Sequence, residues 1–168
     1  LAQGVDVALI DNDPDRIREA RRFGFTVYYG DGTRLDILRQ SGAGTSDMVL
    51  VCVDDPKATD RIVGLVAEHF PSSRLLARSY DRGHSIRLRQ MGVDFEIRET
   101  FESALAFGGA GLRSLGMTAF DVAEVEEDIR RRDIERLEAQ AQGNLMSGRD
   151  SLHVEPRPEP LVTPRQRA

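Results

Sequence analysis

Cysteine is almost absent from this sequence of 168 residues, and histidine is scarce. The one cysteine, Cys52, cannot form a disulfide within the chain, so no disulfide framework holds the fold. It stands in the apolar run from residue 48 to 53, which is typical of a small residue buried in a core. The three histidines and Cys52 do not have the spacing of a zinc site. These absences predict a domain held by its apolar core, and they fit the cytoplasm.

Excess positive charge and long apolar runs are lacking too. The chain has 23 Lys and Arg against 28 Asp and Glu, a formal net charge of −5. This balance argues against a protein that binds nucleic acid without sequence preference, because such binding needs a basic surface. No stretch approaches the roughly 18 to 20 apolar residues of a membrane span. The sequence opens with Leu1 rather than Met, and we expect it to be a fragment of a longer protein.

What the sequence does contain is an alternation of short apolar runs and amphipathic segments between residues 5 and 97. Strands are predicted at 5–10, 26–29, 47–53, 74–77 and 93–97, and helices at 13–23, 35–42, 57–70 and 83–91. Strands and helices that alternate at this spacing predict an α/β fold with a doubly wound parallel sheet and right-handed crossovers.

After residue 97 the pattern changes to helices. A helix is predicted at 99–115, with Phe101, Leu105 and Leu112 on an apolar face and glycines that allow another backbone to approach. A charged helix is predicted at 122–142, whose thin apolar stripe has to dock on something. Residues 143–168 are polar and proline-rich, which indicates a disordered tail. We therefore divide the chain into a first domain at 1–97, two helices at 98–142 and a tail at 143–168.

Polar residues and glycines follow each of the first four predicted strands. They are Asp11 with Asn12, "GDGT" at 30–33, "VDDP" at 53–56 and "ARSYD" at 77–81. Because the carboxyl ends of parallel strands meet at one edge of a sheet, these residues predict a ligand crevice there. Turns and helix caps use the same residue types, so each single position has a structural alternative.

Asp11 fits either of these interpretations, a ligand-binding residue or a helix cap. It is a ribose-binding acid, or it only caps the helix that Pro14 begins. In a dinucleotide-binding unit this acid follows a first strand and a glycine-rich turn by about 20 residues. Ten residues precede Asp11, too few for that strand and turn. The opening "LAQG" is similar to the end of a helix with its glycine C-cap, so we expect the first strand to have been cut away.

The runs "VALIDNDPDRIREARRFGFTVYYGDGTRLDILRQSGA", "VDDP", "HFPSSRLLARSYDRGHSIRLRQMGVD" and "RETFESAL" resemble a known family. It is the RCK/KTN (TrkA-N) domain of Kef-type, glutathione-regulated potassium-efflux antiporters. The resemblance extends from about Gly4 to about Leu137. It implies a Rossmann-like doubly wound sheet, here truncated at its N-terminus, followed by a dimerisation helix and a peripheral helix.

The resemblance also implies a regulatory domain rather than an enzyme. It would bind NAD(H) or AMP and gate potassium efflux, in exchange for protons, in response to glutathione and its adducts. Its partners would be a membrane transporter domain in the same parent chain, a second copy and an ancillary oxidoreductase subunit, at the cytoplasmic face of the inner membrane. The alternatives are an NAD-binding regulatory subunit of another potassium channel or uptake system, and a fragment of an NAD-dependent oxidoreductase.

Carried over by position, the resemblance implies that the nucleotide is bound by Asp11, Asn12, Asp31, Thr33 and Asp54. A carboxylate at position 11 favours NAD(H) or AMP, because it would repel the 2′-phosphate of NADP(H). Arg78 would hold a carboxylate of glutathione; alternatively, it forms a salt bridge to Asp81 or a neighbouring acid.

Three other basic side chains near the crevice carry no such role. Arg87 and Arg89 are predicted to lie on a solvated helix face. Among the histidines, His84 alone is placed to touch a ligand, and we expect it to lack the partner that hydride chemistry needs. No catalytic residue and no metal site is predicted.

Overall fold

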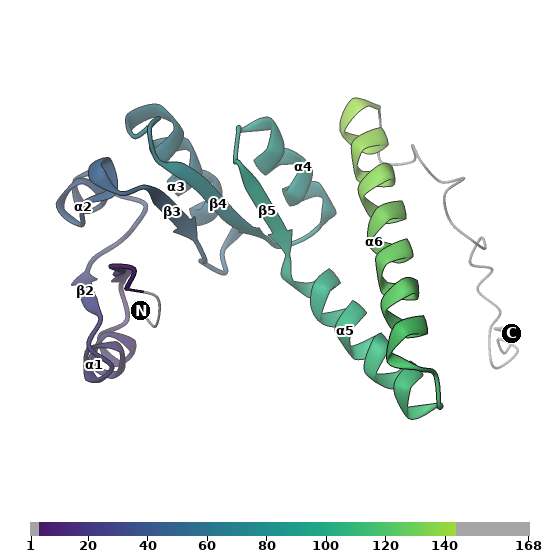
Figure 1. Ribbon diagram of the computed structural model, residues 1–168. Coiled ribbons are helices and arrows are strands. Elements are labelled where there is room, and N and C mark those ends of the chain that lie inside the picture. The colour runs from purple at the N-terminus through teal and green to yellow at the C-terminus, as the bar shows by residue number, and fades with distance from the viewer. Residues whose placement is uncertain (1–3, 144–168) are drawn as a thin grey trace, which may run out of the picture. The chain divides into compact units, whose positions relative to one another are not determined.

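The structure is a computed structural model, and it describes residues 4–143 (Figure 1). Its strands are β1 (Ala8–Asp11), β2 (Thr26–Tyr29), β3 (Met48–Val51), β4 (Arg74–Ser79) and β5 (Phe95–Arg98). Its α-helices are α1 (Pro14–Arg22), α2 (Leu35–Gln40), α3 (Pro56–His69), α4 (Arg82–Gln90), α5 (Glu99–Ser114) and α6 (Ala119–Gln142), and a 3₁₀ turn, η1, covers Ala43–Thr45. The predicted order of strands and helices is confirmed.

Two helix starts follow from the same local sequence, an aspartate followed by a proline. Asp13 accepts a hydrogen bond from the Asp15 N–H, and Pro14 begins α1. Asp55 accepts from the N–H groups of Lys57 and Ala58, and α3 begins at Pro56. Proline suits this position because the first helical N–H groups have no intrahelical acceptor. The carboxylate satisfies the neighbouring donors.

β1 and β3 are each shorter than predicted. β1 begins at Ala8 rather than at residue 5, because β2 offers partners only from Thr26, opposite Ala8, to Tyr29, opposite Asp11. β3 ends at Val51 rather than at residue 53, because its pairing with β4 stops at the partners Val51 and Ala77. In both strands the apolar run is longer than the paired segment.

The five strands form two parallel sheets rather than the one continuous sheet expected over residues 5 to 97. β1 pairs with β2, and β3, β4 and β5 pair in that order (Figure 1). Within residues 4–143, no strand pairs with the second edge of β1 or the second edge of β3.

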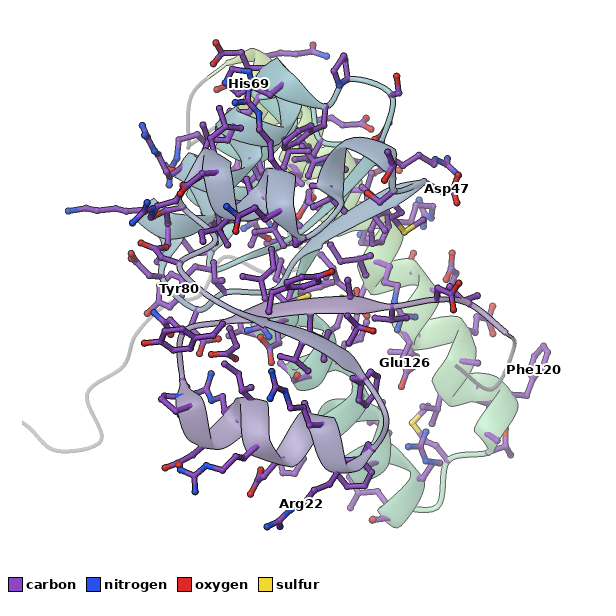
Figure 2. All side chains as sticks on the ribbon, turned by 90° about the vertical axis from the view of Figure 1, so that its left-hand side faces the viewer. Arg22, Asp47, His69, Tyr80, Phe120 and Glu126 are labelled. Carbon is purple, nitrogen blue, oxygen red and sulfur yellow. The ribbon has the colours of Figure 1, made fainter. Side chains whose placement is uncertain are left out.

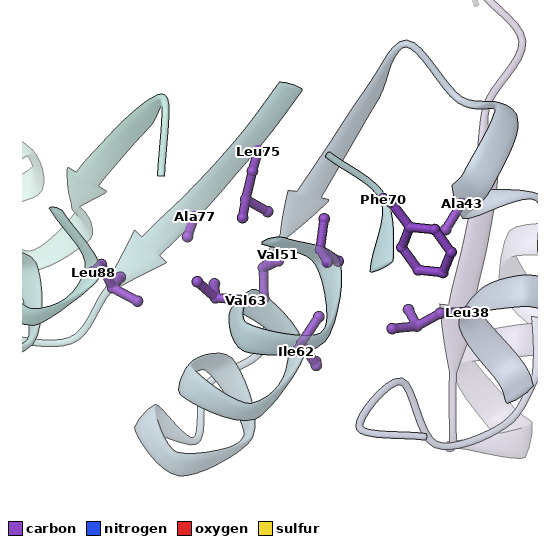
Figure 3. Packing of buried hydrophobic residues seen from close by; sticks show 10 residues of the cluster. Leu38, Ala43, Val51, Ile62, Val63, Phe70, Leu75, Ala77 and Leu88 are labelled. Atoms are coloured by element: carbon purple, nitrogen blue, oxygen red, sulfur yellow. The ribbon is translucent and has the colours of Figure 1, made fainter. Parts of the chain in front are cut away.

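The apolar core lies on one face of the sheet formed by β3, β4 and β5. Val51, Leu75 and Ala77 point from the strands toward Val63 of α3 and Leu88 of α4 (Figure 3). Val63 and Leu88 are fully buried, and Leu38, Ala43 and Phe70 extend the same cluster toward α2 and η1. Close packing of these side chains fixes where the strands end, and so positions the residues that follow them.

The opposite face of this sheet is much less covered. Leu50 is 60% exposed, and Met48, Phe95 and Ile97 are also exposed. Cys52 is exposed as well. The prediction that Cys52 is buried is therefore wrong, because the paired and covered part of β3 ends one residue earlier, at Val51.

The chain divides into two compact units, with the boundary inside α5 between Ala110 and Gly111. On α5, Leu105 is buried, whereas Phe107 is 83% exposed. Val122 and Leu137 of α6 are buried, so part of its apolar stripe is covered. No helix between residues 4 and 143 combines the length and apolarity that a membrane span requires. The tail predicted at 143–168 lies almost entirely outside the described residues.

Candidate functional site

A cavity of about 310 Å³ lies where β3 and β4 end and α5 begins. Its lining comes from four elements and the turns between them: Val53, Asp54, Thr59, Arg78, Ser79, Tyr80, His84, Glu99 and Thr100. Tyr80 follows the last residue of β4, whereas Asp47 precedes the first residue of β3, and Figure 2 shows the two at opposite ends of these parallel strands. The cavity therefore lies at the carboxyl end of this sheet, where open α/β sheets bind their ligands.

Arg78 is the central charged group of this cavity. Its Nη2 atom lies 2.8 Å from Oδ1 of Asp54 and 2.7 Å from Oε2 of Glu99. Its Nε atom is buried and has no hydrogen-bond partner among residues 4–143. Asp81, named above as a possible partner, instead accepts a hydrogen bond from the His84 N–H and caps α4. Arg78 thus pairs with two neighbouring acids, but Asp81 is not one of them.

The aspartates at the strand ends have separate tasks. Asp13, Asp55 and Asp81 each cap the helix that follows. Asp11 and Asp54 precede the caps of α1 and α3 and do not cap these helices. Capping therefore explains only part of the acidic pattern at the strand ends, because Asp11 and Asp54 have no capping role.

Asp11 is the last residue of β1, as the ligand-crevice interpretation requires. Its Oδ1 atom accepts a hydrogen bond of 2.8 Å from the Asp13 N–H, and its Oδ2 atom lies 3.9 Å from Nη1 of Arg16. The side chain is 31% exposed. The turn therefore fixes one carboxylate oxygen and leaves acceptor capacity on the other, while the adjacent Asn12 is exposed.

The turn after β2 is organised by Asp31. Its Oδ1 atom accepts hydrogen bonds of 2.8 Å from both the N–H and the hydroxyl of Thr33. These two bonds, the backbone one first, lower the pKa of Asp31 below its ordinary value of 3.8. Asp31 is exposed, so the turn presents a carboxylate to solvent in a fixed orientation.

The predicted site residues thus form two groups. Asp54 and Arg78 share the cavity and are in direct contact. Asp11, Asn12, Asp31 and Thr33 do not line it, and they lie at or just after the ends of β1 and β2 in the other sheet. Sequence reasoning missed Glu99 as the second partner of Arg78. The available signal was an acidic residue at the first position of a helix directly after a strand.

His84 has a partner that the sequence did not indicate. It is 2% exposed; its Nδ1 atom accepts a hydrogen bond from the Tyr80 N–H, and its Nε2 atom lies 3.1 Å from Oδ1 of Asp60. With Nδ1 as acceptor, the neutral ring carries its proton on Nε2 and donates it to Asp60. Both nitrogens are engaged by the protein, so neither is available as a general base toward a ligand.

Arg87 and Arg89 lie on the exposed face of α4, as expected, with side chains that are 50% and 38% exposed, and both also form ion pairs. Nε of Arg87 donates to Oδ2 of Asp60 at 2.9 Å, which joins α4 to α3. Arg89 donates to Oε1 of the buried Glu96 carboxylate at 2.9 Å, and the Ser79 hydroxyl donates to Oε2 of the same residue. Both arginines are half-exposed ends of ion pairs between elements, because α4 lies directly beside β5 and α3.

Comparisons with known proteins identify the family of this chain. The TrkA-N domain matches residues 1–99, more than half of the chain. The chain belongs to the TrkA-N domain family. It is 41% identical over 141 residues to the glutathione-regulated potassium-efflux system protein KefC of Escherichia coli O139:H28. This match covers 84% of the chain and 23% of KefC, so the chain spans about a quarter of the length of this relative.

Solved structures place the TrkA-N chain in the same fold. The Kef CTD of Shewanella denitrificans, in an AMP-bound form, matches with a TM-score of 0.76 and 30% identity, over 84% of this chain and 85% of that one. The TrkA-N domain of the inner membrane protein ybaL from Escherichia coli matches with a TM-score of 0.59 and 15% identity, over 63% and 78% of the two chains. The Rossmann-like α/β fold class is thereby confirmed.

Proposed function

We propose that this TrkA-N chain is the nucleotide-binding regulatory domain of a Kef-type potassium:proton antiporter. It binds AMP or NAD(H) at the carboxyl ends of its strands and controls potassium efflux in response to glutathione and its adducts. The transporter domain belongs to the same parent chain, and the regulatory domain lies at the cytoplasmic face of the inner membrane. The similarity to KefC and to the Kef CTD supports this proposal.

The observation that carries the nucleotide proposal is the position of Asp11. It ends a parallel strand, it does not cap α1, and one of its oxygens remains available beside the bond to the Asp13 N–H. Such a carboxylate can accept hydrogen bonds from both hydroxyls of an adenosine ribose. Asn12, Asp31, Thr33 and Asp54 complete the proposed contacts, and the AMP-bound form of the similar Kef CTD supports an adenine nucleotide.

We further propose that one more parallel strand lies between β1 and β3 in the longer parent chain. Each of these two strands is paired on one edge only within the described residues, and the two sheets are separate. A strand at this position would join them into one sheet, and the turn after it would supply the backbone N–H groups that a pyrophosphate needs. The nucleotide should therefore be tested on a chain extended by this β-α unit.

Calorimetry on the extended chain tests the nucleotide proposal, with AMP, NAD(H) and NADP(H) as ligands. Asp11→Ala removes one or two ribose hydrogen bonds, and it should weaken AMP binding by about 1–3 kcal/mol, or roughly 5- to 150-fold. The unmodified chain should prefer NAD(H) to NADP(H), because the carboxylate repels the 2′-phosphate.

Asp15→Ala is the matched control, because Asp15 is an exposed aspartate in the first turn of α1. Its affinity for AMP should equal that of the unmodified chain. Equal affinity in the Asp11→Ala and Asp15→Ala variants would remove Asp11 from the site. If the unmodified chain binds NAD(H) and NADP(H) with equal affinity, Asp11 does not select between these two nucleotides.

The effector part of the proposal rests on Arg78. Its guanidinium lines the cavity, and its buried Nε atom has no partner in the described part of the chain, so it has donor capacity for a ligand carboxylate. The tripeptide glutathione carries two carboxylates. A homodimer and an ancillary oxidoreductase subunit complete the proposed assembly. An oxidoreductase activity of this chain is not proposed, because both ring nitrogens of His84 are engaged by protein groups.

A further inference from the structure

One guanidinium nitrogen joins three elements at the cavity. Nη2 of Arg78, on β4, contacts Asp54 in the turn between β3 and α3 and Glu99 at the first position of α5. All three residues belong to the same compact unit. Since the boundary between the two units falls further along α5, Arg78 is bound to the start of the helix that connects them.

The two acids hold Arg78 weakly. Asp54 is 81% exposed and Glu99 is 58% exposed, so water can solvate both carboxylates when they leave the guanidinium. Ion pairs with exposed carboxylates contribute little net free energy. Arg78 itself is 34% exposed, and its buried Nε atom makes no hydrogen bond to any residue that the structure describes. The present arrangement therefore leaves a donor unsatisfied that a better acceptor could use.

A ligand carboxylate would be that better acceptor. The two oxygens of one carboxylate can accept hydrogen bonds from Nε and from one Nη of the same guanidinium. Asp54 and Glu99, by contrast, both pair with Nη2. Bidentate pairing would satisfy the Nε donor and release the exposed acids to water. With Asp54 and Glu99 both kept in place, three carboxylates would crowd one positive charge, which electrostatic repulsion opposes.

We propose that Glu99 competes with the ligand for Arg78, so that occupation of the cavity by a carboxylate ligand releases the start of α5. This inference rests on the proposed role of Arg78 in the effector site. Glu99 remains favourable to the helix after its release, because a carboxylate in the first turn complements the helix dipole. What changes is the connection between β4 and α5, so that the first turns of α5 open more often while the rest of the helix stays formed. Ligand binding and the release of Glu99 are then thermodynamically linked.

The test uses the full-length parent protein and glutathione as the probe. Calorimetry should give a glutathione affinity about 2- to 5-fold higher for Glu99→Gln than for the unmodified protein, since a competing carboxylate is gone. Glu99→Asp should retain competition. Glu102→Gln is the matched control, an acid in the same first turn of α5, and its affinity should not change.

Hydrogen exchange provides a second readout. In the unmodified protein, glutathione should speed amide exchange at the start of α5. In the Glu99→Gln variant, amide exchange at the start of α5 should already be fast, and glutathione should not change its rate. Either of two results overturns the inference. One is a glutathione affinity of Glu99→Gln that is weaker than or equal to that of the unmodified protein. The other is amide exchange at the start of α5 that does not change when glutathione binds to the unmodified protein.

These results also separate this inference from the proposed function. If Arg78→Ala abolishes glutathione binding and Glu99→Gln leaves it unchanged, the effector site is supported, but Glu99 does not compete with the ligand. Binding that does not depend on Arg78 would overturn the effector site and the competition together. A lower glutathione affinity in Glu99→Gln would mean that Glu99 contacts the ligand instead of giving up Arg78 to it.

Discussion

At the scale of single residues, neighbouring acids in one short motif perform different tasks. In "DNDP" the third residue, Asp13, caps α1, and in "DDP" the second aspartate, Asp55, caps α3. The acids before them, Asp11 and Asp54, are left for a ligand or for Arg78. The motif repeats because both tasks arise at the same place, where a parallel strand ends and a helix begins.

Asp31 gives a prediction that needs no ligand. Hydrogen bonds from Thr33 lower its pKa below 3.8, so the carboxylate stabilises the folded turn above the unfolded pKa. This stabilisation is lost as the pH falls through the lower folded pKa. Thr33→Val removes the hydroxyl donor and keeps the backbone one. The Asp31 titration midpoint, followed by NMR, should therefore rise toward 3.8 but remain below it.

Thr45→Val is the control for this titration, since the Thr45 hydroxyl donates to the Gly42 carbonyl rather than to a carboxylate. The Asp31 midpoint should be the same in that variant and in the unmodified chain. If Thr33→Val also leaves it in place, the hydroxyl does not contribute to the shift.

At the scale of elements, α5 differs from the expectation based on its sequence. Leu105, on the apolar face predicted for this helix, is already buried within a single chain. Phe107 is exposed, and the space beside Gly108 and Gly111 is open within 4 Å of where a Cβ would lie. These residues, rather than Leu105, are the ones that a second copy could cover.

Phe107→Asp tests this face of α5 by light scattering. The substitution should leave the single chain folded, because the ring is exposed in it, and should convert a dimer into a monomer. Phe23→Asp is the matched control, an exposed phenylalanine directly after α1, and that variant should remain a dimer. A Phe107→Asp variant that is still dimeric would exclude this face from the interface.

At the scale of the whole molecule, the proposed regulation requires the parent protein. Arg78→Ala should weaken glutathione binding by about 10- to 100-fold, because a charge-assisted hydrogen bond contributes about 1.5–3 kcal/mol. Potassium efflux from cells that carry the full-length protein should then no longer respond to an electrophile.

Arg74→Ala is the control for the efflux measurement. Arg74 lies at the amino end of β4, on the same face as Arg78 but away from the cavity. Efflux in this variant should respond to the electrophile as in the unmodified protein. An unchanged response in Arg78→Ala would leave a nucleotide-binding domain whose effector is not glutathione.

The sequence alone predicts the order and kind of the elements, because these depend on short-range signals. Asp-Pro pairs begin α1 and α3, and apolar periodicity indicates the helices. β-branched and aromatic residues predict β2 with the bounds that the structure has. It also indicated that Asp11 and Asp54 stand at strand ends.

Which of these residues contact one another depends on how the elements pack. Arg78 and Asp54 lie 24 residues apart, and they pair because β4 lies beside β3 in parallel register. His84 meets Asp60, and Glu99 meets Arg78, because helices packed on a sheet bring distant turns to one edge. The exposure of Cys52 was decided in the same way, by where the pairing of β3 ends. Such contacts depend on strand order and register, which local sequence preferences do not specify.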